Sequence, residues 1–448
     1  MINARQLAFI ALKDIHKGAY VDIALDRILK KYQLQDCDRR LMTELVYGSV
    51  RRQRTLDTII DQLATKKSQQ QPSDLRTILH LGLYQIRYQE KIPVSAAVNT
   101  TVQLVKENGF SGLTGFVNGL LRQYLRLLEK TPEPLILPEN PVTKLGILHS
   151  FPDWIIDVWL SQLGFEETEK LCLWMNQTPT IDLRVNILNS SLNEVESAFT
   201  SANILVRKIP NLPQGLRLIS STGPIHNLPG FDAGWWSIQD SSAQLVAHLL
   251  NPSSDSLVID TCAAPGGKTT HLAELMADKG KIFALDKTSS RLRKLQENAQ
   301  RLKLKSIQTL VGDSREFSQF YHEADYVLLD APCSGLGTMH RHADARWRQT
   351  PTSVQELARL QQELLLNTSK FVKSGGVLVY ATCTLHPSEN EEVISQFLAD
   401  NKQWQIEQPQ GDMFKLLDVS SKGWLKVWPH LQDMDGFFMV RLRNTTCS

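Results

Sequence analysis

Five short apolar segments recur between residues 256 and 384, and each ends in a polar or glycine-rich turn. They are SLVIDTCAAPGG, GKIFALDK, IQTLVGD, ADYVLLDAPCSG and GGVLVYATCT. Amphipathic stretches of roughly ten to twenty residues lie between them, which is the length and pattern of helices. Repeated strand and helix units favour a parallel, doubly wound α/β sheet, whose ligands bind beyond the carboxyl ends of the strands. The residues that follow the five segments are therefore the first candidates for a functional site.

The rest of the chain divides into two further parts, since 448 residues are too many for one core. Residues 1–135 carry apolar residues at helical spacing and predict an all-α bundle with breaks at Gly18, 69–73 and 92–93. The stretch TPEPLILPENP, residues 131–141, holds four prolines and predicts a linker. Residues 142–235 mix a helical segment with short strand-like runs and predict a small α+β connecting domain, and the α/β domain occupies 236–448.

Composition excludes several classes of protein. Apolar residues make up 42% and charged residues 21%, both near globular averages. No stretch reaches eighteen uninterrupted apolar residues, and the N-terminus lacks a small-residue cleavage site, so we expect a cytoplasmic protein with no membrane partner. The six cysteines form no CxxC pair, so we expect reduced thiols and no metal site. We also expect a monomer.

Charge is unevenly distributed along the chain. Residues 1–130 carry 20 Lys plus Arg against 12 Asp plus Glu, a balance of +8 within a total of +2. A basic N-terminal module suggests a polyanion such as RNA as partner, although a merely soluble helix surface has a similar composition. The candidate contacts to an RNA backbone are Arg39, Arg40, Arg51, Arg52 and Arg54.

The turn after the first strand, DTCAAPGGKTTHLAELM, predicts a ligand site. Gly266 and Gly267 allow close approach of the backbone to a ligand, and a helix begins near Lys268. A phosphate-binding loop of the G-x4-G-K-[ST] type would need glycine where the chain has Cys262. Asp286 follows the second strand, at the offset where a nucleoside-binding sheet holds ribose hydroxyls, and Asp313 follows the third. This pattern suits an adenosyl ligand without a triphosphate, and S-adenosylmethionine is the usual one.

The fourth and fifth segments end in cysteines. LLDAPCSG contributes Asp330 and Cys333, and YATCTLHP contributes Cys383. A lone cysteine at a strand end is usually a small packed hydrophobe. Strands four and five are neighbours in the usual order of such a sheet, however, so these three side chains are expected in one crevice beside the cofactor. They would supply a nucleophile, an acid and a group for product release, as methylation of carbon 5 of cytosine requires.

Two segments after the fourth strand predict a basic loop and a last strand. TMHRHADARWRQTP, residues 338–351, is a basic loop with one tryptophan and is suited to phosphates and a splayed-out base, with a solvated loop as the alternative. DGFFMVRLRN, residues 435–444, predicts a last strand at the sheet edge.

The motifs DTCAAPGGKT, DAPCSGLGT, RHADARWR, YATCTLHPSENE and DGFFMVRL resemble those of the RNA 5-methylcytosine methyltransferases of the Rossmann type. FVNGLLR and SAAVNTTVQLVK resemble the domain of the antitermination factor NusB. The two resemblances together cover nearly the whole chain. They imply an S-adenosylmethionine-dependent enzyme that methylates a cytosine in small-subunit (16S) ribosomal RNA, with the bundle and the connecting domain positioning the RNA.

The resemblance also implies roles for single residues. Cys383 of the T-C motif would be the nucleophile, Cys333 of the P-C motif would assist product release, and Asp330 would serve both cytosine and cofactor. The implied cofactor-binding residues are Cys262, Ala263, Ala264, Pro265, Gly266, Gly267, Lys268, Asp286, Arg291, Asp313 and Asp330. Many members of the family have RHPD where this chain has Ala343, a difference that touches none of these groups.

Two alternatives stay open on the sequence. The catalytic motifs do not read the substrate, so transfer RNA or another RNA could be methylated instead. The second alternative is a non-catalytic RNA-binding factor of the antitermination type. Such a factor would have little reason to keep both thiols and the strand-end acids.

Overall fold

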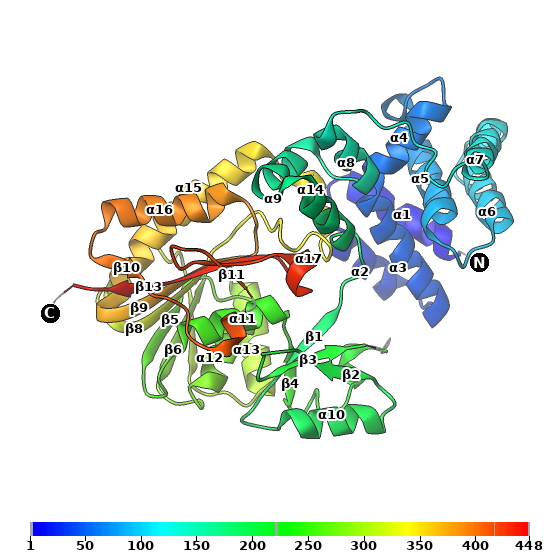
Figure 1. The fold of residues 1–448 in the computed structure, drawn as a ribbon. Coiled ribbons are helices and arrows are strands. Elements are labelled where there is room, and N and C mark those ends of the chain that lie inside the picture. The colour runs from blue at the N-terminus through cyan, green and yellow to red at the C-terminus, as the bar shows by residue number, and fades with distance from the viewer. Residues whose placement is uncertain (1–2, 220–222, 416, 447–448) are drawn as a thin grey trace. The chain divides into compact units, whose positions relative to one another are not determined.

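The structure, a computed structural model, describes residues 3–219, 223–415 and 417–446 (Figure 1). The chain forms two compact units. Residues 1–177 together with 339–348 form the first, called here the helical unit, and residues 178–338 together with 349–448 form the second, the sheet unit.

The described part of the predicted all-α bundle, residues 3–135, contains helices and no strand. The breaks expected at Gly18 and 92–93 fall between two helices, and the break at 69–73 follows α4 and ends where α5 begins at Ser73. Helix α9 is interrupted at Gly164, whose φ is 73°. The helices are α1 (Ala4–His16), α2 (Val21–Lys31), α3 (Asp36–Arg51), α4 (Gln53–Leu63), α5 (Ser73–Tyr88), α6 (Val94–Glu107), α7 (Thr114–Leu128), α8 (Pro141–His149), α9 (Asp153–Trp174) and the short α14 (Ala345–Arg348).

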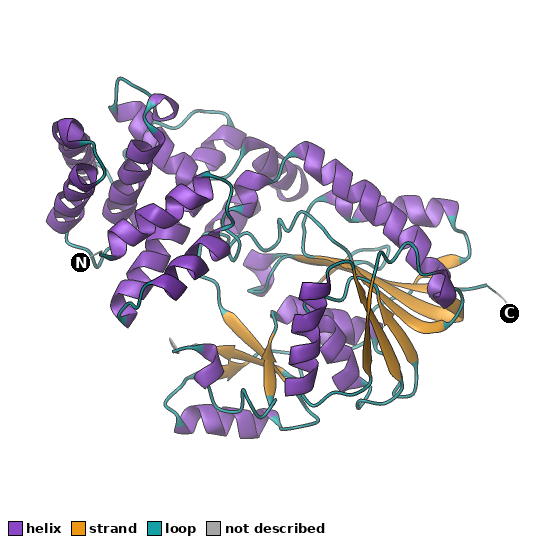
Figure 2. Ribbon diagram, turned by 180° about the vertical axis from the view of Figure 1, so that it is seen from behind, coloured by secondary structure: helices purple, strands orange, loops and turns teal. Residues whose placement is uncertain are grey.

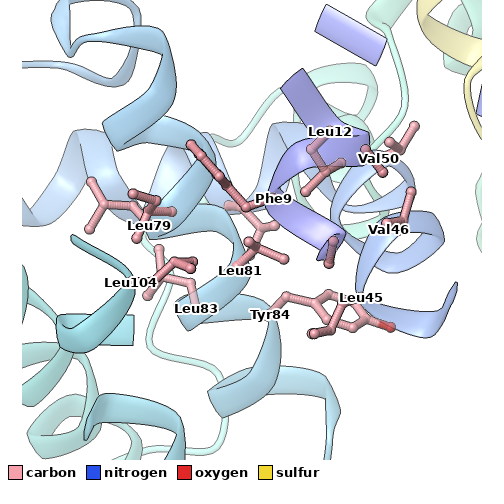
Figure 3. Close-up of a cluster of buried hydrophobic side chains, with 14 of the residues drawn as sticks. Phe9, Leu12, Leu45, Val46, Val50, Leu79, Leu81, Leu83, Tyr84 and Leu104 are labelled. Carbon is pink, nitrogen blue, oxygen red and sulfur yellow. The ribbon is translucent and has the colours of Figure 1, made fainter. Parts of the chain in front are cut away.

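The core of the helical unit is formed by apolar residues that recur every three or four positions along α1, α3 and α5 (Figure 3). Leu45 and Val46 of α3 are fully buried, and Phe9 of α1 is almost so. Gly48 permits the close packing of α3 on α5, since a Cβ atom there would lie 1.9 Å from the ring of Tyr84. The bundle is therefore held by side-chain packing between helices that are distant in sequence.

Residues 339–348 of the predicted RNA-binding loop are part of the helical unit, and some of their side chains are buried in it. Arg346 is 0% exposed, and its guanidinium donates hydrogen bonds to the carbonyl oxygens of Ser150 (3.1 Å) and Met175 (3.3 Å). The indole of Trp347 donates to the carbonyl oxygen of Val50 at 2.7 Å. Backbone carbonyls left over at helix ends need donors, and the loop supplies them. The prediction that Arg346 contacts RNA was wrong, whereas Trp347 is half-buried and its predicted contact with a base stays a prediction.

Two of the bundle arginines proposed as RNA contacts are also used internally. Arg51 is 6% exposed and donates to the carbonyl oxygen of His340 at 3.0 Å. Arg54 donates to the carbonyl oxygen of Phe151 and pairs with Asp153 at 2.7 Å. Arg40 is exposed, and it is the candidate that remains best placed for a partner.

The sheet unit is built on a mixed sheet with the order β11-β12-β13-β9-β8-β5-β6-β7, and β10 pairs with β13. The run from β9 to β7 is parallel, which confirms the predicted doubly wound α/β domain. The strand β13 lies inside the sheet between β9 and β12, so the prediction of an edge position was wrong. The strands are β5 (Leu257–Asp260), β6 (Lys281–Asp286), β7 (Ile307–Val311), β8 (Ala324–Asp330), β9 (Val372–Thr382), β10 (Trp404–Ile406), β11 (Asp418–Val419), β12 (Leu425–Val427) and β13 (Phe437–Asn444).

Helices cover both faces of this sheet (Figures 1 and 2). Alternate residues of one strand serve opposite faces: Leu328 packs with α11 and α12, whereas Val327 and Leu329 pack with α15 and α16. Burial on both faces explains why the strands read as continuous apolar runs. The covering helices are α11 (Ser241–Leu250), α12 (Gly267–Leu275) and α13 (Ser289–Arg301) on one face and α15 (Pro351–Thr368) and α16 (Glu391–Asp400) on the other, and a short α17 spans Pro429–Gln432.

A small antiparallel sheet of order β2-β3-β1-β4 packs with α10 over Phe199 and Trp236. Its other face is polar and meets α12, where the guanidinium of Arg184 on β1 lies 2.6 Å from the carboxylate of Glu274. Both side chains are 0% exposed. A buried pair of this kind fixes one arrangement because removing either partner leaves the other charge unpaired. The elements are β1 (Ile181–Val185), α10 (Leu192–Ser201), β2 (Val206–Lys208), β3 (Gly215–Leu218) and β4 (Trp236–Ile238).

Candidate active site

A cavity of about 420 Å³ lies at the carboxyl ends of the parallel strands. This is a usual size for a site that binds a small molecule. The turns after β5, β6, β7, β8 and β9 all contribute to its wall, as the topology requires. The predicted residues that line it are Cys262, Ala264, Lys268, Asp286, Arg291, Asp330, Cys333 and Cys383.

The turn after β5 is shaped by its two glycines in different ways. Gly266 has a φ of +107°, and a Cβ atom there would lie 2.6 Å from the Leu295 side chain. Gly266 thus permits both the turn and the packing of α13, and it does not itself line the cavity. Gly267 begins α12, and a Cβ atom there would have its nearest neighbours at 3.8 Å. We expected both glycines to lie close to a ligand. The structure instead gives Gly266 a role in packing.

Asp260 lies behind this turn and is almost completely buried. The hydroxyl of Thr269 donates to its carboxyl oxygen Oδ2 at 2.7 Å. Burial raises the pKa of Asp260 to about 7, and the nearby Asp330 carboxylate acts in the same direction. The first strand end therefore carries a carboxyl group that binds a proton far more readily than an ordinary aspartate.

Asp286 at the end of β6 is held by backbone amides. The N–H groups of Thr288 and Ala264 donate to its two carboxyl oxygens at 2.8 and 3.3 Å. Arg291 lies 3.5 Å from the same carboxylate and donates to the carbonyl oxygen of Ala264 at 2.5 Å. These contacts fix a carboxylate on the cavity wall, where it can accept hydrogen bonds from the hydroxyl groups of a ribose.

Asp313 after β7 is not among the described residues that line the cavity. Its carboxylate binds the Arg315 guanidinium at 2.6 Å and the Lys287 ammonium at 2.8 Å. The hydrogen bond from Arg315, with that from Lys287, holds the pKa of Asp313 well below its usual range. Gly312 and Ser314 line the cavity on this side instead.

The two cysteines lie together on the cavity wall because β8 and β9 are adjacent parallel strands. Their sulfur atoms are 3.3 Å apart. The hydrogen bond to Cys383, together with burial, raises the pKa of the Cys333 thiol well above its ordinary value. Cys333 therefore keeps its proton while Cys383 is beside it. Burial also raises the pKa of Cys262, which makes that thiol a weak nucleophile.

A lysine and an aspartate form an ion pair beside the thiols. The Lys268 ammonium lies 2.6 Å from the Asp330 carboxylate and 5.0 Å from the centre of the Phe437 ring. Burial alone would lower the pKa of Lys268, but the Asp330 carboxylate outweighs it, with a contribution from Cys383, and raises that pKa. The Lys268 ammonium therefore keeps its positive charge beside the Asp330 carboxylate.

Several lining residues were missed by sequence reasoning. Thr288 and Lys287 directly follow Asp286, and Ser314 directly follows Asp313, so proximity to a predicted acid was an available signal. Leu360 and Leu364 of α15 present an apolar wall, and Phe437 opens β13. Nothing in the sequence distinguishes these three from ordinary core residues.

Within residues 3–219, 223–415 and 417–446, no group of three or more His, Cys, Asp or Glu side chains is placed to hold a metal ion. The same residues contain no helix that is both long and apolar enough to cross a bilayer. The cysteines at 37, 172, 262, 333 and 383 are free thiols.

Three family models match the chain. Residues 247–443 match the family described as 16S rRNA methyltransferase RsmB/F, and residues 2–126 match the NusB family. Residues 151–225 match the ferredoxin-like domain of the RsmF/B-like methyltransferases. The predicted NusB-like bundle and the α+β character of the connecting segment are thereby confirmed.

Curated relatives and a solved structure match nearly the full length. A probable ribosomal RNA small subunit methyltransferase B from Synechocystis sp. is 49% identical, over 99% of this chain and 100% of that protein. The corresponding protein from Bacillus subtilis is 35% identical over 98% of each chain. The crystal structure of PH0851 superimposes with a TM-score of 0.80 at 27% identity, covering 97% of both chains. The chain therefore belongs to the ribosomal RNA small subunit methyltransferase B family and is an S-adenosylmethionine-dependent methyltransferase.

Proposed function

We propose that this enzyme methylates carbon 5 of a cytosine in small-subunit ribosomal RNA and that Cys383 is its nucleophile. The observation that carries the proposal is the pair of thiols 3.3 Å apart beside the Lys268 and Asp330 ion pair. Methyl transfer to a nitrogen or oxygen atom needs no thiol, whereas transfer to carbon 5 of cytosine needs a nucleophile at carbon 6. The names of the relatives support small-subunit ribosomal RNA as substrate.

The cavity fits the cofactor. Asp286 offers a fixed acceptor for ribose hydroxyls, and Leu360 and Leu364 offer an apolar wall for a purine ring. S-adenosylmethionine bound there supplies the methyl group as an electrophile.

The chemistry assigned to the protein begins at Cys383. Its thiolate forms a bond to carbon 6 of the ring, which raises the electron density at carbon 5. The Lys268 ammonium holds the Asp330 carboxyl group in place. As a carboxylate, Asp330 accepts a hydrogen bond from the cytosine amino group, and in its protonated form it donates one to N3.

Release then requires a base, and Cys333 is suited to this role once Cys383 has reacted. The main cause of the raised pKa of Cys333 is its contact with Cys383. When the sulfur of Cys383 is bound to carbon 6 it carries no negative charge, so Cys333 loses its proton more easily. The Cys333 thiolate can accept the proton from carbon 5. The electron pair of that C–H bond re-forms the ring double bond, and the bond between Cys383 and carbon 6 breaks.

Methyl transfer from labelled S-adenosylmethionine to small-subunit rRNA, large-subunit rRNA and transfer RNA, assayed in parallel, tests the substrate. Digestion of the labelled RNA to nucleosides identifies the modified atom. We expect 5-methylcytosine in small-subunit rRNA alone. Label in transfer RNA would overturn the substrate assignment, and label in another nucleoside would overturn the proposed chemistry.

A further inference from the structure

A buried carboxylate joins the two loops that carry the cysteines. Glu389, in the acidic turn after β9, is 0% exposed. Its carboxyl oxygen Oε1 accepts a hydrogen bond from the backbone N–H of Ser334 at 2.8 Å, and its Oε2 accepts one from the Ser334 hydroxyl. Ser334 directly follows Cys333. The two hydrogen bonds of the carboxylate therefore hold Ser334 in place, and with it the backbone next to Cys333.

The same network reaches the second cysteine. The hydroxyl groups of Ser334 and Thr384 are 2.8 Å apart, and Thr384 directly follows Cys383. Asn390 directly follows Glu389, and its side chain forms hydrogen bonds with the two residues on either side of Cys383 in the sequence. It accepts from the hydroxyl of Thr382 at 2.6 Å and donates to the carbonyl oxygen of Thr384 at 3.0 Å.

Glu389 also forms hydrogen bonds with Gln361 and Tyr380. Gln361 of α15 donates from one amide nitrogen to Glu389 at 3.0 Å and to the carbonyl oxygen of Pro332 at 2.9 Å. The hydroxyl of Tyr380 donates to the backbone carbonyl oxygen of Glu389 at 2.5 Å. Tyr380 and Gln361 are both fully buried. A network of this kind, with its donors satisfied and without access to water, holds one geometry strongly.

We propose that Glu389 is a positioning residue that sets the separation of the Cys333 and Cys383 sulfur atoms, so that both reach one cytosine ring. That both sulfur atoms act on the same ring rests on the proposed function. The fixed separation itself is a property of the free protein.

The negative charge of Glu389 has a second effect. It contributes to the raised pKa of Cys333, after the contact with Cys383 and burial. One residue thus supports the spacing of the sulfur atoms and contributes to the raised pKa of the Cys333 thiol.

The test uses dibromobimane, a reagent that becomes fluorescent when it bridges two nearby thiols, with peptide mapping to identify the bridged pair. Wild-type protein should bridge Cys333 to Cys383. In Glu389→Ala three buried donors lose their acceptor and the loops separate, so bridging should be about tenfold slower. Glu392→Ala, which removes an exposed carboxylate from the following helix, is the matched control and should bridge at the wild-type rate.

A carboxylate that merely stabilised the fold would lower the melting temperature and leave the bridging rate of the folded protein unchanged. That result would overturn the proposal. If Glu389→Ala does not fold, Thr384→Val removes one hydroxyl and keeps the side-chain shape, and we expect bridging to be about threefold slower. A wild-type rate in that variant would also overturn the proposal.

The catalytic part is measured separately as the fraction of enzyme trapped in a covalent complex with RNA. Glu389→Ala should trap more than the wild type at unchanged affinity for S-adenosylmethionine, because Cys333 no longer reaches carbon 5. If bridging slows as expected but no variant, the wild type included, ever forms a complex, the positioning of the sulfur atoms stands and the proposed covalent chemistry fails.

Discussion

The Lys268 ammonium lies 2.6 Å from the Asp330 carboxylate; Lys268 stands at the start of α12 and Asp330 is the last residue of β8. Their side chains are only 14% and 29% exposed. The pair therefore connects the start of α12 to the end of the strand that leads to Cys333.

Substitutions of the two adjacent glycines should differ sharply in effect. Gly266→Ala places a Cβ atom 2.6 Å from Leu295 at a φ of +107°, so we expect a loss of stability of about 2 kcal/mol or more and at least tenfold weaker binding of S-adenosylmethionine. Gly267→Ala meets nothing closer than 3.8 Å and should bind within about twofold of the wild type. Calorimetric titration measures the affinity of each variant for S-adenosylmethionine. Equal losses of affinity in the two variants would contradict the packing role of Gly266.

Two strand-end acids should contribute unequally to cofactor affinity. Asp286→Asn removes a carboxylate from the cavity wall, and we expect affinity for S-adenosylmethionine to fall about ten- to a hundredfold. Asp313→Asn alters a side chain that is bound to Arg315 and Lys287, and the affinity should change less than about threefold. A larger loss in Asp313→Asn would restore the sequence-based expectation that Asp313 contacts the cofactor.

Arg346 should act on stability rather than on RNA binding. Arg346→Met leaves buried carbonyl oxygens without donors, so we expect a loss of about 3 kcal/mol from the helical unit at unchanged cofactor affinity. Arg126→Met, on the exposed face of α7, is the control and should change stability by less than about 0.5 kcal/mol. Urea unfolding measures the difference. Normal stability combined with weakened RNA binding in Arg346→Met would return this residue to an RNA interface.

Asp260 should make stability depend on pH. Its folded-state pKa of about 7 lies above the ordinary value, so the folded protein binds the proton more tightly than the unfolded chain. Stability from this group is therefore fully present at low pH and falls as pH rises from about 4 to 7, by a few kcal/mol. Asp260→Asn removes the titration, so its melting temperature relative to wild type should be higher at pH 8 than at pH 5. An equal difference at both values would show that Asp260 does not titrate in this range.

The sequence predicted the strand ends well because buried parallel strands have a distinctive pattern, and topology then brings their ends together. Cys333 and Cys383 could be paired in this way although fifty residues separate them. The environment of the loop at 339–348 could not be predicted, since Arg346 looks the same in sequence whether it faces phosphate or a carbonyl group. Glu389 was equally hidden, because an acidic turn is usually solvated and only the fold shows that this carboxylate is buried.

In the proposed mechanism Cys383 forms the bond to the base and Cys333 releases it. Small-subunit rRNA and S-adenosylmethionine are incubated with wild type, Cys383→Ala and Cys333→Ala, and denaturing electrophoresis with peptide mass mapping then detects covalent complexes of protein and RNA. We expect no complex and no methylation with Cys383→Ala. With Cys333→Ala we expect a complex through Cys383 to accumulate and little free product to form. A complex or normal methylation with Cys383→Ala would contradict the proposed mechanism.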